Sequence, residues 1–469
     1  MEFQPVVMAA GRGSRMTDLT CKSHKALLPI GNMPMMWYPI NMLEMAGFTE
    51  AIVVVLDSFA TEAQKVLTEI CDVKMRLDFI SIPDTEYWGT ADVLRHIKDR
   101  IKTDVLIISS DLISDVSIHD IANVHRTYDA TITSLLSNIP EQYNEIPAPG
   151  PKSKKKPEKD YIGLDEKGCR VLFYTPEADL DAEKVKISKS LLKRHPCVSI
   201  KSNLTDCHLY LMKKWVIDFL MEKRSISSIK GELLPYLTKK QFSKPKREDL
   251  PNTDASVLSA NVAKDIFSFI SQDPMLKKVE KTSTWIDHTG DMENCYHGNQ
   301  IRCYAYLQSI GFCARTNTVS TYCEINRQIP RLLQALAPEK EIPTKHSSAV
   351  IKGTSQVGSE CLVGEGVTIG DKVSIKRSVI GKHCTVGDKV KITNSVILDH
   401  VNIGEGCNIQ GSIVSSNSHI NDKTDLKDCI VGTGENVKIT CDAARLLCSS
   451  SSKKNNHLST DCLHVGMEL

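Results

Sequence analysis

Residues 363–397 read VGEGVTIGDKVSIKRSVIGKHCTVGDKVKITNSVI, and the spacing of their apolar residues decides the fold of the C-terminal part of the chain. Apolar residues recur every six positions with a one-residue slip, so the pattern repeats every 17 residues. Over residues 349–440 the repeat forms three columns: Val363, Ile380, Ile397, Val414 and Val431; Ile369, Val386, Ile403, Ile420 and Val437; Ile375, Ile392, Ile409 and Leu426. Three columns with a common period predict a three-sided coil whose turns stack on one another. The sequence therefore predicts a left-handed parallel β-helix of hexapeptide repeats.

Glycine follows several of the column residues, as in Val363-Gly364, Ile369-Gly370 and Ile380-Gly381. A sharp corner needs a residue that tolerates unusual backbone angles, and glycine does so because it has no Cβ. We therefore expect these glycines to form the corners of the coil.

The first 136 residues alternate between strand-like and helix-like patterns. Five apolar runs are typical of buried strands: Val6 to Met8, Ile52 to Leu56, Phe79-Ile80, Val105 to Ile108 and Ile132 to Leu136. Between them, Met36, Ile40 and Leu43 share one helical face that ends before Gly47, and a second helical pattern follows Thr90 as its N-cap. Near-continuous apolar strands separated by helices predict a parallel sheet covered on both faces, as in a doubly wound, Rossmann-like α/β domain.

Composition divides the 469-residue chain into segments. We expect an N-terminal domain over 1–337 that closes with a helical region at about 300–336, a linker over 338–348, the coil over 349–440 and a polar, disordered tail over 441–469. Loop insertions interrupt the domain at about 144–160 and 243–260. The first insertion, NEIPAPGPKSKKKPEKD, is rich in Pro and Lys and has no aromatic residue, which favours a solvated loop over a phosphate-binding patch.

Charge and cysteine content bound the class of protein. The chain carries 58 basic and 57 acidic residues, a formal net charge of +1, which provides no overall attraction to nucleic acid or an anionic membrane. No apolar run approaches the ~18 residues that a membrane helix needs. The 16 cysteines include no CxxC pair, which favours a reducing compartment. We expect a cytosolic protein that binds neither membranes nor nucleic acid directly.

The most informative stretch for chemistry is VVMAAGRGSRMTDLTCKSHKALLPIGN at residues 6–32. A strand runs into Gly11 and Gly13, which let the backbone approach a phosphate and point N–H groups at it. Arg15 and Lys25 could add fixed positive charge beside a triphosphate. We take these four residues as a candidate nucleotide loop.

This stretch, together with Gly89-Thr90-Ala91, Asp111, Trp285 and Asp287, resembles the motifs of the sugar-1-phosphate nucleotidyltransferase family. In that family a sugar phosphate attacks the α-phosphorus of a nucleoside triphosphate and expels pyrophosphate. The resemblance implies that Asp111 and Asp287 stand at the positions of the two aspartates that hold catalytic Mg²⁺. It also implies a β-helix after the catalytic domain, and it covers nearly the whole chain except the tail.

The departures from these motifs cluster on the substrate side. The family's base-reading Gln is missing from residues 80–88, and the sugar-contacting EKP element is replaced by Tyr174-Thr175-Pro176. The NAGIY element reads DCHLY at residues 206–210, where His208 fills space that glycine leaves open. The prolines that flank the motif lysine are replaced by His24 and Ala26, and the WxDxGT element is out of register at 285–290.

The departures imply a degenerate site without catalytic residues, metal or cofactor. Gly11, Gly13, Arg15 and Lys25 then form a vestigial nucleotide loop, and Asp111 and Asp287 are vestigial metal positions. For individual residues we favour ordinary structural roles: Asp111 as a helix cap, Arg15 as an ion-pair partner and Lys25 as a solvated side chain. The histidines His24, His208 and His288 are expected to make local contacts rather than to bind a metal.

Within this family the chain is most similar to the gamma subunits of eukaryotic translation initiation factor 2B. The similarity lies in DVLIISSDLISDV at 104–116, ISSIKGELLPYLTKKQF at 226–242 and NIQGSIV at 408–414. It implies a non-catalytic subunit of the decameric complex that exchanges GDP for GTP on initiation factor 2. The implied partners are the epsilon subunit, which carries the exchange step, the other subunits of the decamer, and initiation factor 2.

An active sugar-1-phosphate nucleotidyltransferase, such as a mannose-1-phosphate guanylyltransferase, is the alternative. Intact EKP and NAG elements would favour that enzyme, and their absence favours the assembly subunit.

Overall fold

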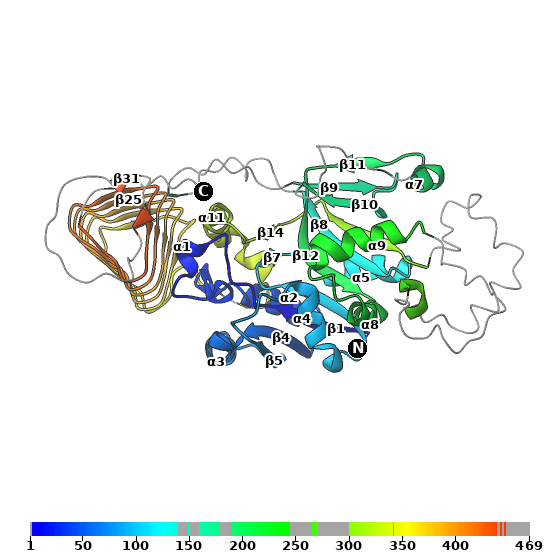
Figure 1. The fold of residues 1–469 in the computed structure, drawn as a ribbon. Coiled ribbons are helices and arrows are strands. Elements are labelled where there is room, and N and C mark those ends of the chain that lie inside the picture. The colour runs from blue at the N-terminus through cyan, green and yellow to red at the C-terminus, as the bar shows by residue number, and fades with distance from the viewer. Residues whose placement is uncertain are drawn as a thin grey trace, which may run out of the picture.

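The computed structural model describes residues 2–138, 149–150, 159–177, 187, 189–243, 265–270, 300–340, 342–438, 441–442 and 445–446. Figure 1 shows an α/β domain that holds the N-terminus and, beside it, a triangular coil of short strands. Helix α11 (Val319–Leu336) lies on the side of the domain that faces the coil. Within these ranges no helix is both long enough and apolar enough to cross a membrane.

The N-terminal domain is built on a seven-stranded sheet with the strand order β13-β8-β12-β6-β1-β4-β5. Its strands are β1 (Phe3–Met8), β4 (Glu50–Leu56), β5 (Arg76–Ile82), β6 (Asp104–Ser109), β8 (Ile132–Asn138), β12 (Leu204–Met212) and β13 (Cys303–Gln308). All five runs predicted as strands lie in these elements. β1, β4, β5 and β6 are parallel, as their near-continuous apolar sequences predict.

Two expectations for this domain are wrong. β12 runs antiparallel to both neighbours, β6 and β8, so the sheet is mixed rather than parallel. The region from 300 to 336 is only partly helical, because β13 and β14 (Cys313–Arg315) precede α11. The aromatic, strand-favouring run CYAYL at 303–307 is the sequence signal for β13.

Smaller sheets and helices complete the domain. The smaller sheets are β10-β9-β11, made of β9 (Asp160–Leu164), β10 (Val171–Pro176) and β11 (Ser199–Lys201); β7 (Leu112–Ser114) with β14; and β2 (Pro29–Ile30) with β3 (Met33–Pro34). The remaining helices are α1 (Thr17–Thr20), α2 (Trp37–Met45), α3 (Ala60–Lys65), α4 (Thr90–His96), α5 (Ile118–Thr127), α7 (Lys189–Arg194), α8 (Lys214–Glu222) and α9 (Leu234–Lys240). Short helical turns are η1 (Lys25–Leu27), η2 (Asp57–Phe59), η3 (Val66–Ile70), η4 (Lys98–Arg100), η7 (Ile229–Leu233) and η8 (Ile266–Phe269).

The predicted helix ends are close to the observed ones. Helix α2 is followed by Gly47 in the left-handed conformation, with φ of 83°, as expected for a residue just beyond a helix end. Helix α4 begins one residue earlier than predicted, because its N-cap is Gly89 rather than Thr90. The Thr90 hydroxyl instead accepts a hydrogen bond from the Ile229 amide.

The coil has three sides, each a parallel six-stranded sheet. Side one contains β15 (Val350–Ile351), β18 (Thr368–Ile369), β21 (Thr385–Val386), β24 (Asn402–Ile403), β27 (His419–Ile420) and β30 (Asn436–Val437). Side two contains β16 (Gln356–Val357), β19 (Ser374–Lys376), β22 (Lys391–Thr393), β25 (Asn408–Gln410), β28 (Asp425–Lys427) and β31 (Cys441–Asp442). Side three contains β17 (Leu362–Val363), β20 (Val379–Ile380), β23 (Val396–Ile397), β26 (Ile413–Val414), β29 (Ile430–Val431) and β32 (Arg445–Leu446).

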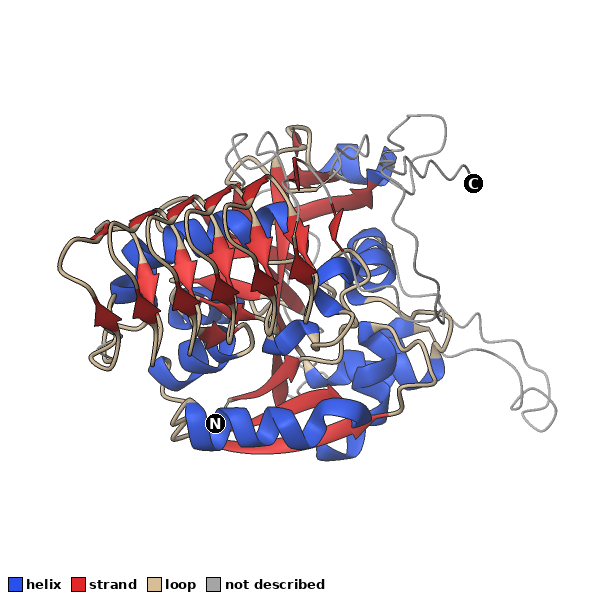
Figure 2. Cartoon of the chain, turned by 90° about the vertical axis from the view of Figure 1, so that its left-hand side faces the viewer, coloured by secondary structure: helices blue, strands red, loops and turns tan. Residues whose placement is uncertain are grey.

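The strand register confirms all three predicted columns. On side two Ile375 pairs with Ile392, Ile392 with Ile409, and Ile409 with Leu426. The columns of side one and side three pair in the same way, each residue with the one 17 positions on. Figure 2 shows the resulting rungs stacked along the coil. Strands β31 and β32 lie past residue 440, so described residues of the expected tail belong to the coil.

The role expected for the coil glycines is wrong. None of Gly364, Gly370 and Gly381 has a positive φ. A Cβ on Gly364 would lie 2.7 Å from the carbonyl carbon of Gly381 in the next turn, so these glycines are needed for close approach between turns. The left-handed corners are elsewhere, and one of them includes His383 and His400, with φ of 53° and 57°.

A second apolar row joins the coil to the domain. Side three carries an outward residue beside each inward one, and this outward row is buried in the core of the N-terminal domain: Leu362, Val379, Val396, Ile413 and Ile430. A Cβ on Gly31 would lie 2.2 Å from Ile329 of α11 and 3.2 Å from Leu362, so the joint is tightly packed. The two parts therefore share one hydrophobic core.

Polar contacts follow the same joint along the coil. The Lys22 Nζ donates to the Thr433 carbonyl at 2.9 Å, and the Asn32 Nδ2 donates to the Ile380 carbonyl at 3.1 Å. Between them along the coil, the Arg327 guanidinium of α11 donates to the Asn394 carbonyl at 3.2 Å. Most of the insertion at 144–160 lies outside the described residues, but Pro149 and Gly150 are buried and Gly150 donates to the Asp428 carbonyl of the coil. That part of the insertion is therefore packed rather than solvated.

Candidate functional site

The candidate nucleotide loop lies between the carboxyl end of β1 and helix α1. Gly13 has φ of 72°, and a Cβ there would lie 2.9 Å from the Thr20 side chain, so this position needs glycine for both conformation and space. A Cβ on Gly11 would meet nothing within 4 Å. Arg15 is exposed. Gly11, Gly13 and Arg15 thus keep the loop expected from the sequence, but Lys25 is turned to another task.

Lys25 contacts Asp111 across the carboxyl edge of the sheet. β1 and β6 are adjacent parallel strands, so the loops that follow them meet at the same edge. The Lys25 Nζ lies 2.5 Å from a carboxylate oxygen of Asp111, and the two side chains are 12% and 3% exposed. The expectations of a solvated Lys25 and of Asp111 as a helix cap are therefore both wrong.

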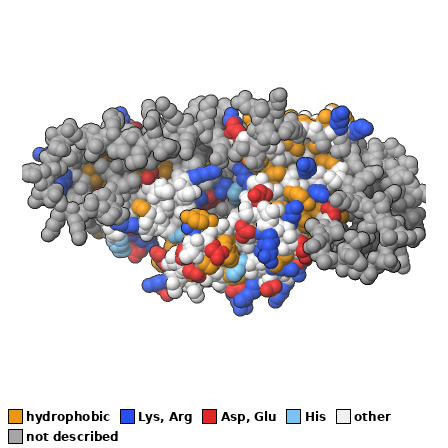
Figure 3. All heavy atoms as spheres, viewed as in Figure 1, with side chains coloured by type: hydrophobic (Ala, Val, Ile, Leu, Met, Phe, Trp, Pro, Cys, Tyr) orange, Lys and Arg blue, Asp and Glu red, His pale blue; other side chains and the backbone are white. Residues whose placement is uncertain are grey.

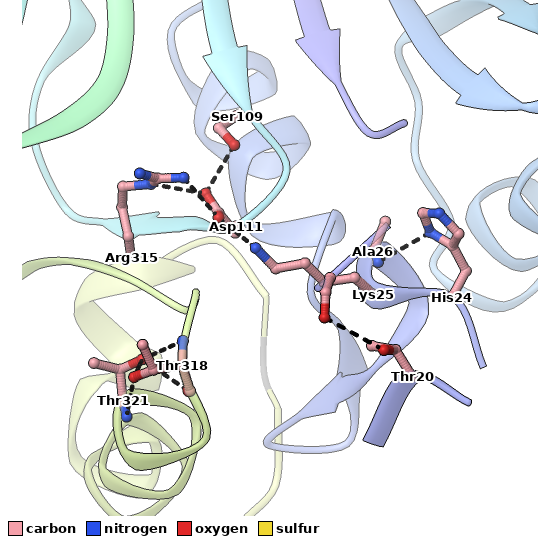
Figure 4. Close-up of polar contacts among 10 residues, drawn as sticks. Thr20, His24, Lys25, Ala26, Ser109, Asp111, Arg315, Thr318 and Thr321 are labelled. Carbon is pink, nitrogen blue, oxygen red and sulfur yellow. Dashed lines mark hydrogen bonds and ion pairs between the residues drawn. The ribbon is translucent and has the colours of Figure 1, made fainter. Parts of the chain in front are cut away.

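Arg315 is the second cation on Asp111, and sequence reasoning missed it. Its Nε donates to one carboxylate oxygen at 3.1 Å and its Nη2 to the other at 2.9 Å, a bidentate pair. The Ser109 Oγ donates to the same carboxylate at 2.7 Å. Figure 4 shows Arg315 and Lys25 approaching Asp111 from different directions. Arg315 comes from β14, which pairs with β7 just after Asp111, and no motif in the sequence indicates this contact.

The electrostatics of this ion cluster, formed by Lys25, Asp111 and Arg315, favour a charged carboxylate. Burial alone would raise the pKa of Asp111, but the charges of Arg315 and Lys25 and the Arg315 hydrogen bonds lower it well below its ordinary value. The same pairing raises the pKa of the Arg315 guanidinium against the effect of burial. Two protein cations therefore occupy the carboxylate that would hold Mg²⁺, and Asp111 as placed here does not fit a metal site.

His208 sits where the family motif has glycine, in a bulge of β12. Pairing with β8 is interrupted between Asp206 and Tyr210, and His208 there has φ of 54°, a conformation that favours glycine. The Asp206 carboxylate accepts hydrogen bonds from the His208 amide at 2.7 Å and from the Tyr210 hydroxyl at 2.8 Å. Burial, and then the nearby Arg315 charge, lower the pKa of His208 well below its ordinary value, so the ring is neutral. A buried imidazole thus fills the space beside Asp111.

The neighbouring substrate-side positions are also filled. Tyr174, in the place of the EKP element, is 4% exposed. Burial first, and then the charges of Asp206 and Asp160, raise the pKa of Tyr174 well above its ordinary value. The Lys230 Nζ lies 2.8 Å from Asp160.

The GTA element serves as a packing surface. A Cβ on Gly89 would lie 2.1 Å from the Ser227 carbonyl oxygen, and the Ala91 amide donates to that oxygen at 2.8 Å. Ser227 belongs to the ISSIKGELLPYLTKKQF stretch, so these two sequence signals meet in space. Glycine is required at 89 for this close approach.

Arg12 closes the loop from the other side. Its guanidinium donates to the Asp84 carbonyl and, at 2.9 Å, to the Glu86 carbonyl, and it lies 4.3 Å from the Tyr87 ring centroid. These residues belong to the segment that lacks the family's base-reading Gln. His24 stacks on Phe59 with ring centroids 3.5 Å apart, a local contact as expected.

The remaining candidate positions cannot be placed. Trp285, Asp287 and His288 lie outside the described residues. Among the residues that the structure describes, no three His, Cys, Asp or Glu side chains converge in a way that could hold a metal ion.

Comparison with known proteins defines the class and then the family. The nucleotidyl transferase family model matches residues 4–145, and the EIF2B subunit epsilon LbH domain model matches residues 343–443. The chain is therefore a nucleotidyltransferase-like protein with a C-terminal left-handed β-helix. It is 30% identical to translation initiation factor eIF2B subunit gamma of Dictyostelium discoideum over 403 residues, 81% of this chain and 87% of that protein. It is 32% identical to the subunit of the same name in Schizosaccharomyces pombe over 382 residues, 80% and 74% of the two chains, and it belongs to the eIF2B subunit gamma family.

Similarity to sugar-nucleotide enzymes is weaker and shorter. The mannose-1-phosphate guanyltransferase of Debaryomyces hansenii is 26% identical over 146 residues, 30% of this chain and 40% of that protein.

Proposed function

We propose that this chain is a non-catalytic subunit of a cytosolic eIF2B complex, which exchanges GDP for GTP on initiation factor 2. In this proposal it pairs with the epsilon subunit, supports the exchange module that epsilon carries, and contributes to assembly with the other subunits and to binding of initiation factor 2. The observation that carries the non-catalytic part is the ion cluster on Asp111. Family membership supports the rest.

The ion cluster removes the electrostatic basis of nucleotidyl transfer. A metal-assisted transfer needs free carboxylate oxygens that hold a divalent cation against the phosphates. Here Lys25 and Arg315 neutralise Asp111 directly, and Lys25 is no longer available to a triphosphate. We therefore propose that Gly11, Gly13, Arg15 and Lys25 are a vestigial nucleotide loop, and that Asp111 and Asp287 are vestigial metal positions.

The acceptor side supports the same conclusion. A sugar phosphate has to reach the α-phosphorus in line with the leaving group, which requires open space beside the metal position. The His208 ring is buried in the neighbouring bulge, and Tyr174 is buried where the family's sugar-contacting residues stand. Restoring catalysis would therefore need changes at several separate positions.

The surfaces left open by the fold favour binding to proteins. Side three of the coil is covered by this chain's own domain, so a partner subunit has side one and side two available. Side one presents an exposed polar row: Thr368, Thr385, Asn402, His419 and Asn436. On the face in Figure 3, acidic and basic side chains are interspersed over the described residues of the domain, as expected for a protein without a nucleic-acid surface.

Catalysis is tested with the purified chain, Mg²⁺, GTP or UTP and a panel of sugar 1-phosphates. We expect no release of pyrophosphate above a blank without protein. Turnover that disappears in an Asp111→Ala variant would contradict the proposal and establish the enzyme alternative.

The subunit role is tested by co-expression with epsilon. We expect the two chains to co-elute, and labelled GDP to leave initiation factor 2 faster with the pair than with epsilon alone. The isolated chain should release none. A chain that does not co-elute with epsilon, or a pair no faster than epsilon alone, would count against the proposed function whatever the first assay gives.

A further inference from the structure

Two thiols lie in contact beside the ion cluster. The Sγ atoms of Cys207 in β12 and Cys313 in β14 are 3.3 Å apart, although 106 residues separate them in the sequence. We propose that this pair is a redox modification site, in which a hydroperoxide oxidises Cys313 and Cys207 then closes a reversible disulfide. The inference does not depend on the proposed function.

The backbone holds both cysteines where a bond can form. Cys207 lies in the bulge where β12 is unpaired with β8, so its position has freedom to adjust. Cys313 is fixed by pairing with Ser114 in β7, and the Ser137 Oγ donates to its carbonyl oxygen. A disulfide has an S–S length of about 2.05 Å, so the two sulfurs have to approach by only a little more than ~1 Å.

The two thiols differ in the way that peroxide chemistry requires. Cys313 is partly exposed, whereas Cys207 is buried. The hydrogen bond from Cys207 lowers the pKa of Cys313 although burial opposes it, and the same interaction raises the pKa of Cys207. The thiolate therefore forms on the sulfur that a small oxidant can reach, with a second thiol in contact behind it.

The chemistry balances with hydrogen peroxide as the oxidant. The Cys313 thiolate attacks one peroxide oxygen and breaks the O–O bond, which gives a sulfenic acid on Cys313 and releases hydroxide. The Cys207 sulfur then attacks the sulfenic sulfur, the S–S bond forms, and the hydroxyl group leaves as water with the Cys207 proton. In total two thiols lose two electrons, and one peroxide becomes two waters. A dithiol reductant reverses the bond.

The bond would tie together the two elements that build the ion cluster. Arg315 is two residues beyond Cys313 on β14, and His208 follows Cys207 in the bulge. Oxidation therefore fixes the strand that carries Arg315 to the bulge that carries His208. Backbone amides of residues 206–209 and 313–315 should exchange hydrogen more slowly in the oxidised chain, and the midpoint of thermal unfolding should rise.

The test uses the full chain, co-expressed with epsilon where it needs that partner to stay folded. The reduced protein is treated with hydrogen peroxide, remaining thiols are blocked with N-ethylmaleimide, and non-reduced peptides are identified by mass spectrometry. We expect a peptide pair joined through Cys207 and Cys313, lighter by two hydrogen atoms than the free peptides. Dithiothreitol should remove it.

Variants separate the proposed roles. Cys313→Ser should abolish the joined peptide, and Cys207→Ser should leave Cys313 as a sulfenic acid that a dimedone probe labels. Cys197→Ser, which removes an exposed thiol, should leave the joined peptide unchanged. If both cysteines of the wild-type chain remain alkylated by maleimide while Cys197 is oxidised, or if either joins mainly to another cysteine, the proposal is wrong. That readout does not depend on whether any variant folds.

Discussion

Arg315 contributes to stability because it completes the charge balance of a buried carboxylate. Removing one partner of a buried ion pair leaves an uncompensated charge, so Arg315→Ala should lower the free energy of unfolding by about 3–5 kcal/mol in urea titrations at pH 7. The pKa of Asp111 is depressed in the folded chain, so the contribution of the ion cluster is present above about pH 4 and is lost as the pH falls further. Arg100→Ala, which removes an exposed pair with Asp78, should cost less than ~1 kcal/mol. Equal losses for Arg315→Ala and Arg100→Ala would show that the ion cluster is not the cause.

The backbone at His208 makes a second prediction at the same scale. Any side chain at φ of 54° is strained, and glycine is not, so His208→Gly should be more stable than His208→Ala by about 1 kcal/mol. The order should reverse at the neighbouring Leu209, where the backbone is not left-handed and glycine costs about 0.5–1 kcal/mol relative to alanine. Thermal melts of the four variants give both comparisons. Alanine more stable than glycine at both positions would contradict the strain.

At the scale of single elements, the coil register predicts opposite effects for adjacent residues of β22. Ile392 is fully buried between Ile375 and Ile409, so Ile392→Ala should cost about 2–5 kcal/mol through the cavity that it leaves. Lys391 faces solvent, and Lys391→Ala should change stability by less than ~0.5 kcal/mol. Equal shifts of the two variants in thermal melts would contradict the three-column register.

The outward row of side three gives the next prediction. Val396 points away from the inside of the coil but is 2% exposed, because the N-terminal domain covers it. Val396→Asp should therefore destabilise the whole chain, since it places an unpaired carboxylate in the shared core. Asn402→Asp, an outward change on the exposed side one, should have little effect. The outcome is read from urea unfolding followed separately in the coil and in the domain. If Val396→Asp melts the coil alone, the core is not shared.

Repetition explains which elements the sequence could predict. The columns of the coil recur every 17 residues, so each turn repeats the same signal, and strands such as β4 are long continuous apolar runs. The pairs Val379-Ile380, Val396-Ile397 and Ile413-Val414 also repeat, but only the structure shows that their first members face the domain. Arg315 could not be predicted as a partner of Asp111, because 204 residues separate them and neither β14 nor the pairing with β7 has a distinct pattern.

For the molecule as a whole, buried neutral histidines predict how stability depends on pH. Burial, the largest cause, lowers the pKa of both His24 and His125 to about 4. The unfolded chain, with histidine pKa near ~6.5, then binds more protons at intermediate pH, so stability is complete above that value and declines as the pH falls toward 4. Replacing His125, which is 4% exposed, by Gln should reduce the loss between pH 7.5 and 5.5 by about 1 kcal/mol. Replacing the exposed His119 should leave the loss unchanged. Urea midpoints at the two pH values decide between these outcomes.

The shared core also sets an order of events during synthesis. The ribosome makes α11 and the turn at Gly31 before any residue of the outward row that covers them. At ~5–20 residues per second, the stretch from α11 to the last covering residue, Ile430, takes on the order of 5–20 s to appear. During that interval the nascent domain presents an uncovered apolar surface on which molecular chaperones can act. The N-terminal domain is the first part of the chain to be made and among the last to be finished.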